Sequence, residues 1–181
     1  MDSRLSFDAE LRVMNERVNL LEALHGKPAL ATLTSFSGGF FTGKPQTRDH
    51  SSFFGIAPEQ PGPDRKALRL RFQYTEAGYV LSVKNTGEHY RKFVSKVWLD
   101  VFGATHSNPG RPAFFSLIDQ NNNTLTRDTI KMTHTPITLM TPNNKYVGRL
   151  TARGSPYIYL GETKEHAKIT FILSVLKPSP S

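Results

Sequence analysis

The fold is decided by three short stretches of alternating residues: Ala31-Thr32-Leu33, Tyr79-Val80-Leu81 and Ile137-Thr138-Leu139. Twenty-two residues beyond each leucine stands a glycine that follows a large apolar residue, in the pairs Phe54-Gly55, Phe102-Gly103 and Leu160-Gly161. Each copy then ends in an apolar-x-apolar couplet: Leu70-x-Phe72, Phe115-x-Leu117 and Phe171-x-Leu173. Self-similarity at a period of about 50 residues is typical of a structure built from one repeated unit. The sequence therefore predicts three related units, with these leucines and the phenylalanines Phe72, Phe115 and Phe171 buried.

The spacing of turn residues predicts the strands within each unit. Stretches rich in Val, Ile, Thr, Tyr and Phe are interrupted every 8–12 residues by Gly, Pro and Asn, which is the pattern of all-β proteins. The predicted strands are 29–35, 39–44, 51–57 and 67–73, then 78–84, 89–96, 98–105 and 113–119, then 136–141, 145–152, 156–162 and 167–175. Hairpin turns are expected at Ser37-Gly38-Gly39, Asn85-Thr86-Gly87 and Pro142-Asn143-Asn144.

Residues 7–24 are predicted to form an N-terminal helix. Ser6 is a suitable cap and Gly26 a stop signal. Leu11, Met14, Val18 and Leu21 recur at helical spacing and make one apolar stripe. Such a stripe is expected to pack against the domain or, alternatively, against a second chain in a homodimer.

Twelve strands in three four-strand units resemble the β-trefoil. The segments that carry the resemblance are 143–148, Tyr157-x-Tyr159-x-Gly161 and Ile169-x-Phe171, which look like one lobe of a fascin-type trefoil, with residues 38–43 as the counterpart in the first copy. The resemblance covers residues 28–176 and implies six strands closed into a short barrel, with three hairpins capping one end. The expected organisation is an N-terminal helix (1–27), an all-β trefoil domain (28–176) and a tail (177–181). The trefoil hosts lectins, cytokines, protease inhibitors and actin-binding proteins, so it does not specify the activity.

Composition sets further limits. The chain has 181 residues, 38% of them hydrophobic and 10% aromatic, which is sufficient for one globular domain. There is no cysteine, no apolar run near 18 residues, and no apolar core of a secretory signal after Met1. A cytoplasmic location is expected, with export lacking a classical signal as the alternative.

The net charge of +8 favours anionic partners such as nucleic acid, acidic lipid or sulfated sugar. The third unit holds the densest group of basic residues, and the trefoil resemblance implies that its loops bring them to one face. These residues are Lys145, Arg149, Arg153, Lys164 and Lys168. The alternative is a solvated surface with no dedicated partner.

No motif for catalysis stands out. The six histidines lack the spacing of a helical metal site, and neither a phosphate-binding glycine loop nor a nucleophile elbow is present. We therefore expect no enzymatic activity, no metal and no cofactor.

Sugar recognition needs an aromatic face and neighbouring polar groups that hydrogen-bond hydroxyls. The candidate aromatics are Tyr90, Trp98, Tyr157 and Tyr159, and the candidate polar residues are His89, His106, Asn108, Asn143 and Asn144. Barrel packing is the alternative role of Tyr90 and Trp98. The Gln-x-Trp triplet of ricin-type lobes is missing, which argues against that lectin group alone.

The sequence favours a non-enzymatic, lectin-like binding protein. The alternative is a cytosolic protein-interaction module, either actin-binding in the manner of fascin or inhibitory in the manner of trefoil protease inhibitors. Residues 121–134 exceed what the repeat needs and are long enough for an added hairpin; whether they serve binding or are a tolerated insertion stays open.

Overall fold

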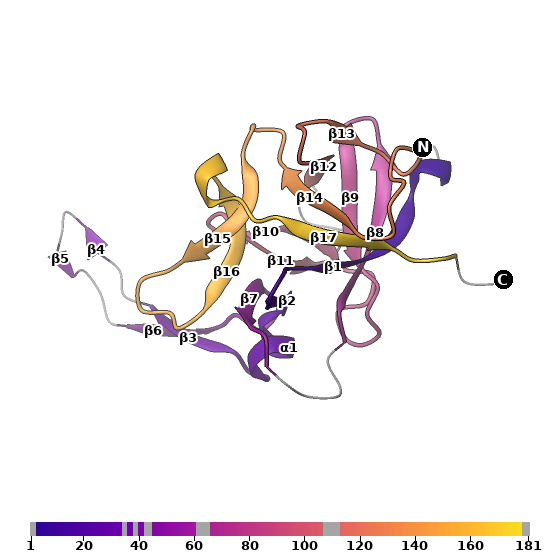
Figure 1. Ribbon diagram of the computed structural model, residues 1–181. Coiled ribbons are helices and arrows are strands. Elements are labelled where there is room, and N and C mark those ends of the chain that lie inside the picture. Colours follow the sequence, from indigo (N-terminus) through magenta and orange to yellow (C-terminus); the bar gives the residue numbers. More distant parts are fainter. Residues whose placement is uncertain are drawn as a thin grey trace.

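The chain folds as an all-β protein (Figure 1). The computed structural model describes residues 3–33, 45–60, 66–106 and 113–178, and the backbone of residues 36–37 and 40–41. Its first strands are β1 (Phe7–Arg12), β2 (Glu16–Leu20), β3 (Leu30–Leu33), β4 (Phe36–Ser37), β5 (Phe40–Phe41), β6 (Gln46–Asp49), β7 (Phe54–Pro58) and β8 (Leu68–Thr75). They are followed by β9 (Gly78–Val83), β10 (Phe93–Trp98), β11 (Val101–Thr105), β12 (Phe114–Ile118), β13 (Thr124–Leu125), β14 (Thr135–Met140), β15 (Tyr146–Thr151), β16 (Ile158–Thr163) and β17 (Phe171–Val175).

In the described residues, helical structure is confined to short turns. They are the five-residue α1 (Leu21–His25) and the 3₁₀ turns η1 (Ser3–Leu5) and η2 (Glu165–Ala167). Within the described ranges, no helix has the length and apolar character needed to cross a membrane.

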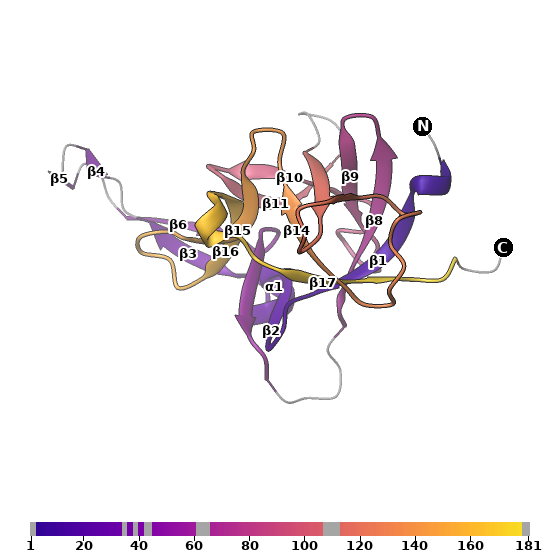
Figure 2. The ribbon, with the colours of Figure 1, turned by 45° about the horizontal axis from the view of Figure 1, so that its top comes forward.

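Six strands close into a ring. β1 pairs with β8, β8 with β9, β9 with β12, β12 with β14, β14 with β17, and β17 again with β1, all antiparallel. Figures 1 and 2 show β1, β8 and β9 at the end of the molecule that carries η1. Because each ring strand is paired on both sides, the ring has no open edge that would attract another chain.

Three hairpins adjoin this ring: β2–β7, β10–β11 and β15–β16. They meet one another through pairings of β7 and β11 with β16, and through a bridge between Phe53 and Gly103. The three glycines of the repeat, Gly55, Gly103 and Gly161, lie at these junctions. The strands predicted for the second and third units are thus confirmed in type and order, although β10 begins at Phe93, several residues later than expected.

The core repeats the same pairing three times. Phe72 lies opposite Leu81, Leu117 opposite Leu139, and Leu173 opposite Leu11. All six side chains are buried, as are Phe115 and Phe171, which confirms the predicted burial of Leu81, Leu139 and the three phenylalanines. Leu11, Leu81, Leu139, Phe115 and Phe171 are among the residues that line an apolar void of about 30 Å³.

The prediction for Leu33 is wrong. Leu33 is half-buried on β3, opposite Gln46 and outside the ring, and Leu11 occupies the position equivalent to Leu81 and Leu139. Leu11 and Gly55 are 44 residues apart, twice the separation in the other two units, because β3 and β6 are inserted between them. The described part of the strand predicted at 29–35 is β3, which lies outside the ring. Of the strand predicted at 39–44 only the backbone of residues 40–41 is described, as β5, and the turn predicted at 37–39 extends outside the described residues.

The predicted N-terminal helix is also wrong, because residues 7–20 form β1 and β2 in the large sheet. Phe7, Ala9 and Leu11 are buried while the residues between them are more exposed, so the two-residue period of a strand outweighs the helical one. Val18 and Leu21 are buried within this chain and Met14 is 72% exposed at a turn. The homodimer expected through this helix thus loses its basis.

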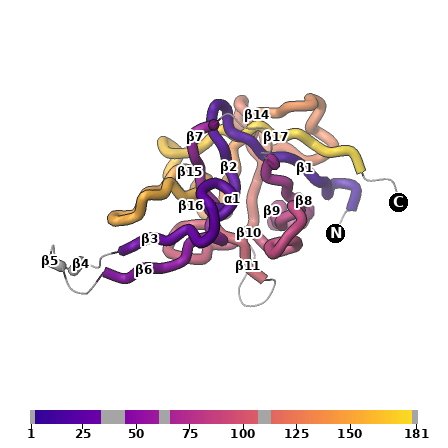
Figure 3. The backbone as a smooth tube through the Cα atoms, turned by 90° about the horizontal axis from the view of Figure 1, so that it is seen from below, coloured from indigo at the N-terminus to yellow at the C-terminus, as the bar shows by residue number. Residues whose placement is uncertain are grey.

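The inserted strands β3 and β6 pair with each other and form a ribbon that we call the arm. Figure 3 shows β3 and β6 side by side, leading away from α1, with β15 and β16 on the same side of the molecule. A close approach connects the two: a Cβ atom at Gly154, whose φ is +90°, would lie 2.6 Å from the Thr32 carbonyl oxygen. The turn after β15 is thereby packed against β3.

The extra stretch of the second unit adds one short strand. β13 pairs with β12 through Leu125 and Leu117, and Asp119 accepts hydrogen bonds from the amides of Asn121 and Asn123 at the turn. Further along, the hydroxyl of Tyr79 accepts a hydrogen bond from the Arg127 amide and donates one to Leu5, and burial raises the pKa of Tyr79 to about 12. These contacts give the stretch a structural role. In the proline-rich loop after β7, residues 61–65 lie outside the described part.

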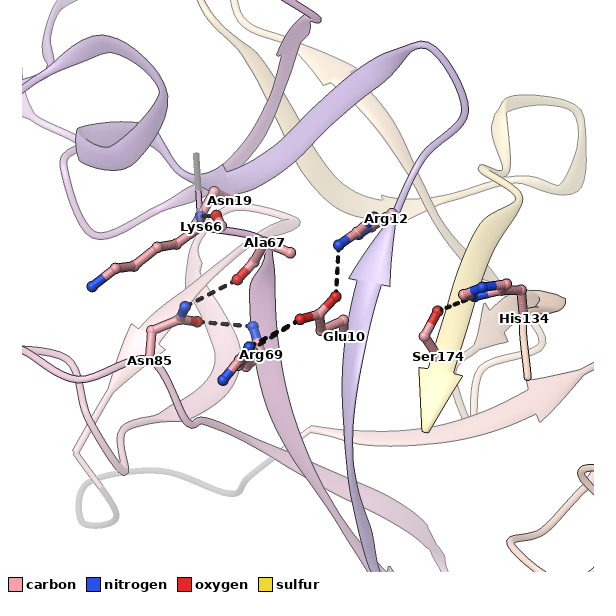
Figure 4. A network of polar contacts seen from close by, with 9 residues as sticks. All are labelled: Glu10, Arg12, Asn19, Lys66, Ala67, Arg69, Asn85, His134 and Ser174. Carbon is pink, nitrogen blue, oxygen red and sulfur yellow. Dashed lines mark hydrogen bonds and ion pairs between the residues drawn. The ribbon is translucent and has the colours of Figure 1, made fainter. Parts of the chain in front are cut away.

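A polar network holds the strands around β1 in register (Figure 4). Glu10 on β1 accepts hydrogen bonds from Arg12 at 2.8 Å and from Arg69 on β8 at 3.2 Å. The Asn85 side chain accepts a hydrogen bond from the backbone amide of Arg69 and donates one to the backbone carbonyl of Ala67. These contacts fix the outer face of the ring.

Candidate functional site

A group of aromatic side chains lies where the three hairpins meet. We call His50, Phe53, Trp98 and Tyr159 the aromatic cluster. The His50 ring centroid is 4.3 Å from that of Phe53 and 4.8 Å from that of Trp98, and the Trp98 and Tyr159 centroids are 5.7 Å apart. The residues come from three separate segments, so only the assembled hairpins bring them together. Trp98 is half-buried, whereas His50 and Tyr159 are fully buried.

His50 is the polar centre of the cluster. Its Nδ1 shares a hydrogen bond of 2.7 Å with the Tyr159 hydroxyl, which in turn shares one of 2.6 Å with Ser155. Its Nε2 is buried and has no hydrogen-bond partner among the described residues. Burial lowers the pKa of His50 below its usual 6.5, and Arg48 acts in the same direction against the opposing Asp49 carboxylate.

Acid is expected to destabilise the protein through His50. Because the folded state lowers the pKa of His50, the unfolded chain binds the proton more readily. The contribution of neutral His50 to the free energy of unfolding is therefore fully present above about pH 6.5 and is lost as the pH falls below that value. Chemical denaturation at about pH 7.5 and about pH 5 should show a smaller loss for His50→Phe than for the wild type. His25, whose pKa is also lowered by burial, keeps part of the slope. The exposed His166→Gln is the control, and equal pH dependence of wild type and His50→Phe would contradict the prediction.

The cluster adjoins a surface hollow of about 430 Å³. The arm, the β10–β11 turn and the end of the β15–β16 hairpin supply its walls. Its lining residues are Leu33, Gln46, Arg48, Trp98, Leu99, Thr151, Ala152 and Arg153. Gln46 and Arg48 lie two positions apart on β6, so both side chains occupy one face of the ribbon, and Arg48 donates a 3.1 Å hydrogen bond to Gln46. The hollow therefore combines an aromatic ring, an aliphatic edge and two guanidinium groups.

Two of the predicted site residues, Trp98 and Arg153, line this hollow together. Tyr157 lies nearby against the same core, with its ring 6.3 Å from Tyr159 and 4.9 Å from His25. The other six lining residues, which are Leu33, Gln46, Arg48, Leu99, Thr151 and Ala152, were not predicted as site residues. The one available signal was the doubled separation between Leu11 and Gly55, which marks an insertion in the first unit.

The predicted basic face of the third unit is assembled only in part: Lys145, Lys164 and Lys168 lie at one end of the β15–β16 hairpin, and Arg153 lies at the other. Arg149 forms a two-pronged ion pair with Glu16, and Lys168 lies 5.0 Å from the centre of the Tyr146 ring. Lys145 precedes the six-residue β15 and Arg153 follows it, a separation of about 20 Å along an extended strand. Lys164 is exposed beside η2, near the Lys145 end. The backbone pairing of β15 with β16 thus separates Arg153 from Lys145 and Lys164, which lie at the opposite end of the hairpin.

The other predicted ligand residues are scattered. The Asn143 side chain donates a 3.5 Å hydrogen bond to Glu162, and Asn144 adopts a φ of +57° in the turn before β15. Tyr90 is 38% exposed between β9 and β10, with Lys84 and Arg91 beside its ring. His106 is exposed after β11, and Asn108 lies outside the described residues.

One acidic group has the geometry of a metal site but is occupied by cations of the chain. Glu22, Glu88 and His89 offer ligand atoms within 4.8 Å of one another. The Lys27 ammonium lies 2.6 Å from Glu88, His89 bonds directly to Glu22, and Lys92 lies 3.2 Å from the second His89 nitrogen. The cluster is therefore an ion-pair network beside α1.

Comparisons with known proteins assign no family to this chain. The chain matches no protein-family model, no curated protein and no solved structure.

Proposed function

We propose that the chain is a β-trefoil. The proposal is supported by the six-strand ring, the three hairpins beside it and the threefold recurrence of the pairings Phe72–Leu81, Leu117–Leu139 and Leu173–Leu11. The repeated unit then consists of β1, β2, β7 and β8, of β9 to β12, and of β14 to β17. The arm is an insertion into the first unit.

We further propose that the protein is a non-enzymatic, lectin-like carbohydrate-binding protein whose site is the hollow beside Trp98. The observation that carries this proposal is the half-buried Trp98 ring, held by Phe53, His50 and Tyr159 and bordering a hollow that also offers the polar groups of Thr151 and Gln46. An aromatic ring fixed by its neighbours presents an apolar surface to a sugar ring at little entropic cost, and adjacent polar groups hydrogen-bond hydroxyls.

The test begins with a glycan array at low and moderate salt, followed by titration of the bound sugar in solution. Trp98 is the one tryptophan of the chain, so its fluorescence reports directly on the hollow. Trp98→Ala is expected to weaken binding about tenfold or more, which corresponds to about 1.4 kcal/mol, as measured by calorimetry. Trp98→Phe keeps an aromatic ring against Phe53 and should retain an intermediate affinity.

Tyr90→Ala is the matched control, because Tyr90 is an exposed aromatic residue that does not line the hollow. It should bind as the wild type does. Absence of any bound glycan, or equal affinities of Trp98→Ala and wild type, would contradict carbohydrate binding at this site and support a protein-interaction role instead.

A further inference from the structure

We propose that the ligand of the hollow is an acidic saccharide, one whose sugar rings carry carboxylate or sulfate groups, and that Arg48 and Arg153 hold those groups. This inference rests on the proposed function and adds the ligand class. Both arginines line the same hollow although they come from β6 and from the turn after β15. A guanidinium group binds a carboxylate or sulfate through two parallel hydrogen bonds, which lysine cannot do.

The charge of the hollow supports an anionic ligand. Among the described residues that line it there are two arginines and neither Asp nor Glu. The two nearest carboxylates along the chain are engaged elsewhere: Asp49 accepts hydrogen bonds from the backbone and side chain of Ser51, and Asp100 lies 3.7 Å from the Lys96 ammonium. Asp49 also follows Arg48 in a strand, where successive side chains point to opposite faces. The described lining of the hollow therefore carries a net positive charge.

The arm gives the site its second wall. Gly154 packs against the Thr32 carbonyl oxygen, which sets the Arg153 turn beside the ribbon that carries Arg48. Trp98 and Leu99 line the same hollow; Leu99 is 77% exposed and has a φ of +49° in the β10–β11 turn. A hollow lined by both apolar and cationic residues suits an acidic saccharide, whose rings have apolar faces and carry carboxylate or sulfate groups at their edges.

The site is expected once per chain despite the threefold repeat. Leu21, Val97 and Leu150 are equivalent, because a Cβ atom on the glycine of each junction would contact them in turn. The residues that follow them are Glu22, Trp98 and Thr151, so one hairpin alone offers an aromatic ring at this position. The arm is likewise present in the first unit alone. A stoichiometry of one saccharide site per chain follows.

The experiment titrates the full chain, by Trp98 fluorescence and by calorimetry, with three oligosaccharide probes. They are dextran, dextran sulfate and oligogalacturonate, of matched length, at low and moderate salt. We expect the acidic probes to bind at least about tenfold more tightly than dextran, with weaker binding at higher salt because exposed charges are screened. The sulfated and the carboxylated probe separate the two sources of negative charge.

Arg48→Gln and Arg153→Gln should each weaken binding of the acidic probes about tenfold and should weaken dextran binding by a smaller factor, because dextran carries no acidic group for the guanidinium to bind. The matched control is Lys145→Gln with Lys164→Gln, which removes two exposed positive charges at the other end of the β15–β16 hairpin. It should change affinity less than about twofold. Thermal unfolding of every variant checks that the fold persists.

Distinct outcomes separate the two proposals. If dextran binds as tightly as the acidic probes and Trp98→Ala abolishes that binding while the arginine variants do not, the acidic ligand is overturned and the carbohydrate site stands. If no saccharide binds, the proposed function itself fails. Tighter binding of a single-stranded oligonucleotide that depends on the same arginines would overturn the saccharide in favour of nucleic acid.

Discussion

Replacing Leu81 by alanine is expected to lower the free energy of unfolding by about 2–5 kcal/mol, as measured by chemical denaturation. Leu81 is 1% exposed, lies opposite Phe72 in the ring and lines the small central void. Truncation removes buried methyl groups and enlarges a void that paired strands cannot collapse to fill. The loss should therefore fall in the full range measured for core leucines.

The same experiment distinguishes the two candidates for the equivalent position in the first unit. Leu11→Ala should cost about as much as Leu81→Ala, because Leu11 is 2% exposed and lies opposite Leu173. Leu33→Ala is the matched control, since Leu33 is half-buried on the arm, and it should cost less than either. A larger loss for Leu33→Ala than for Leu11→Ala would contradict the register described above.

The second large effect is expected at a hairpin junction, where Gly161→Ala should destabilise the protein by about 1–3 kcal/mol. A Cβ atom there would lie 2.7 Å from the Asp100 carbonyl oxygen and would overlap the Leu150 side chain. The Asp100 carbonyl cannot move freely, because it accepts a 2.8 Å hydrogen bond from the Glu162 amide. Loss of this bond or displacement of the turn would follow from the added methyl group.

A double variant identifies which overlap matters. Leu150→Ala in the Gly161→Ala background removes the side-chain overlap but leaves the carbonyl, so it should not restore the stability of Leu150→Ala alone. Thermal and chemical unfolding of the four proteins in this cycle give the coupling between the two positions. Wild-type stability of Gly161→Ala would show that the junctions are looser than these contacts indicate.

The second and third units could be predicted from the sequence because their signals are local. Alternating apolar residues around Leu81 and Leu139, turn residues at the right spacing, and the glycines Gly103 and Gly161 all lie within one uninterrupted unit. The prediction for the first unit was wrong because the arm is inserted between β2 and β7. Leu33 happened to stand at the right distance from Gly55, and the residues around Leu11 satisfy helical spacing and strand alternation at once.

The candidate site is formed by contacts between segments that are distant in the sequence, and the spacing of residues along the chain does not predict those contacts. The hollow brings together Arg48, Trp98 and Arg153, which follow one another at intervals of about 50 residues. The hairpins meet at the junctions of Gly55, Gly103 and Gly161. In addition, Gly154 packs against the arm, which brings Arg153 close to Arg48.

The sequence by itself determined the all-β class, most strands of two units and the residues of their core, because burial of one strand face imposes a period of two residues. The tertiary structure alone decided which strand completes the ring, where the basic side chains lie and which aromatic residue borders a hollow. The physical reason is that pairing between strands distant in sequence fixes these positions, and the free energy of that pairing is shared across the whole closed sheet rather than carried by any single segment.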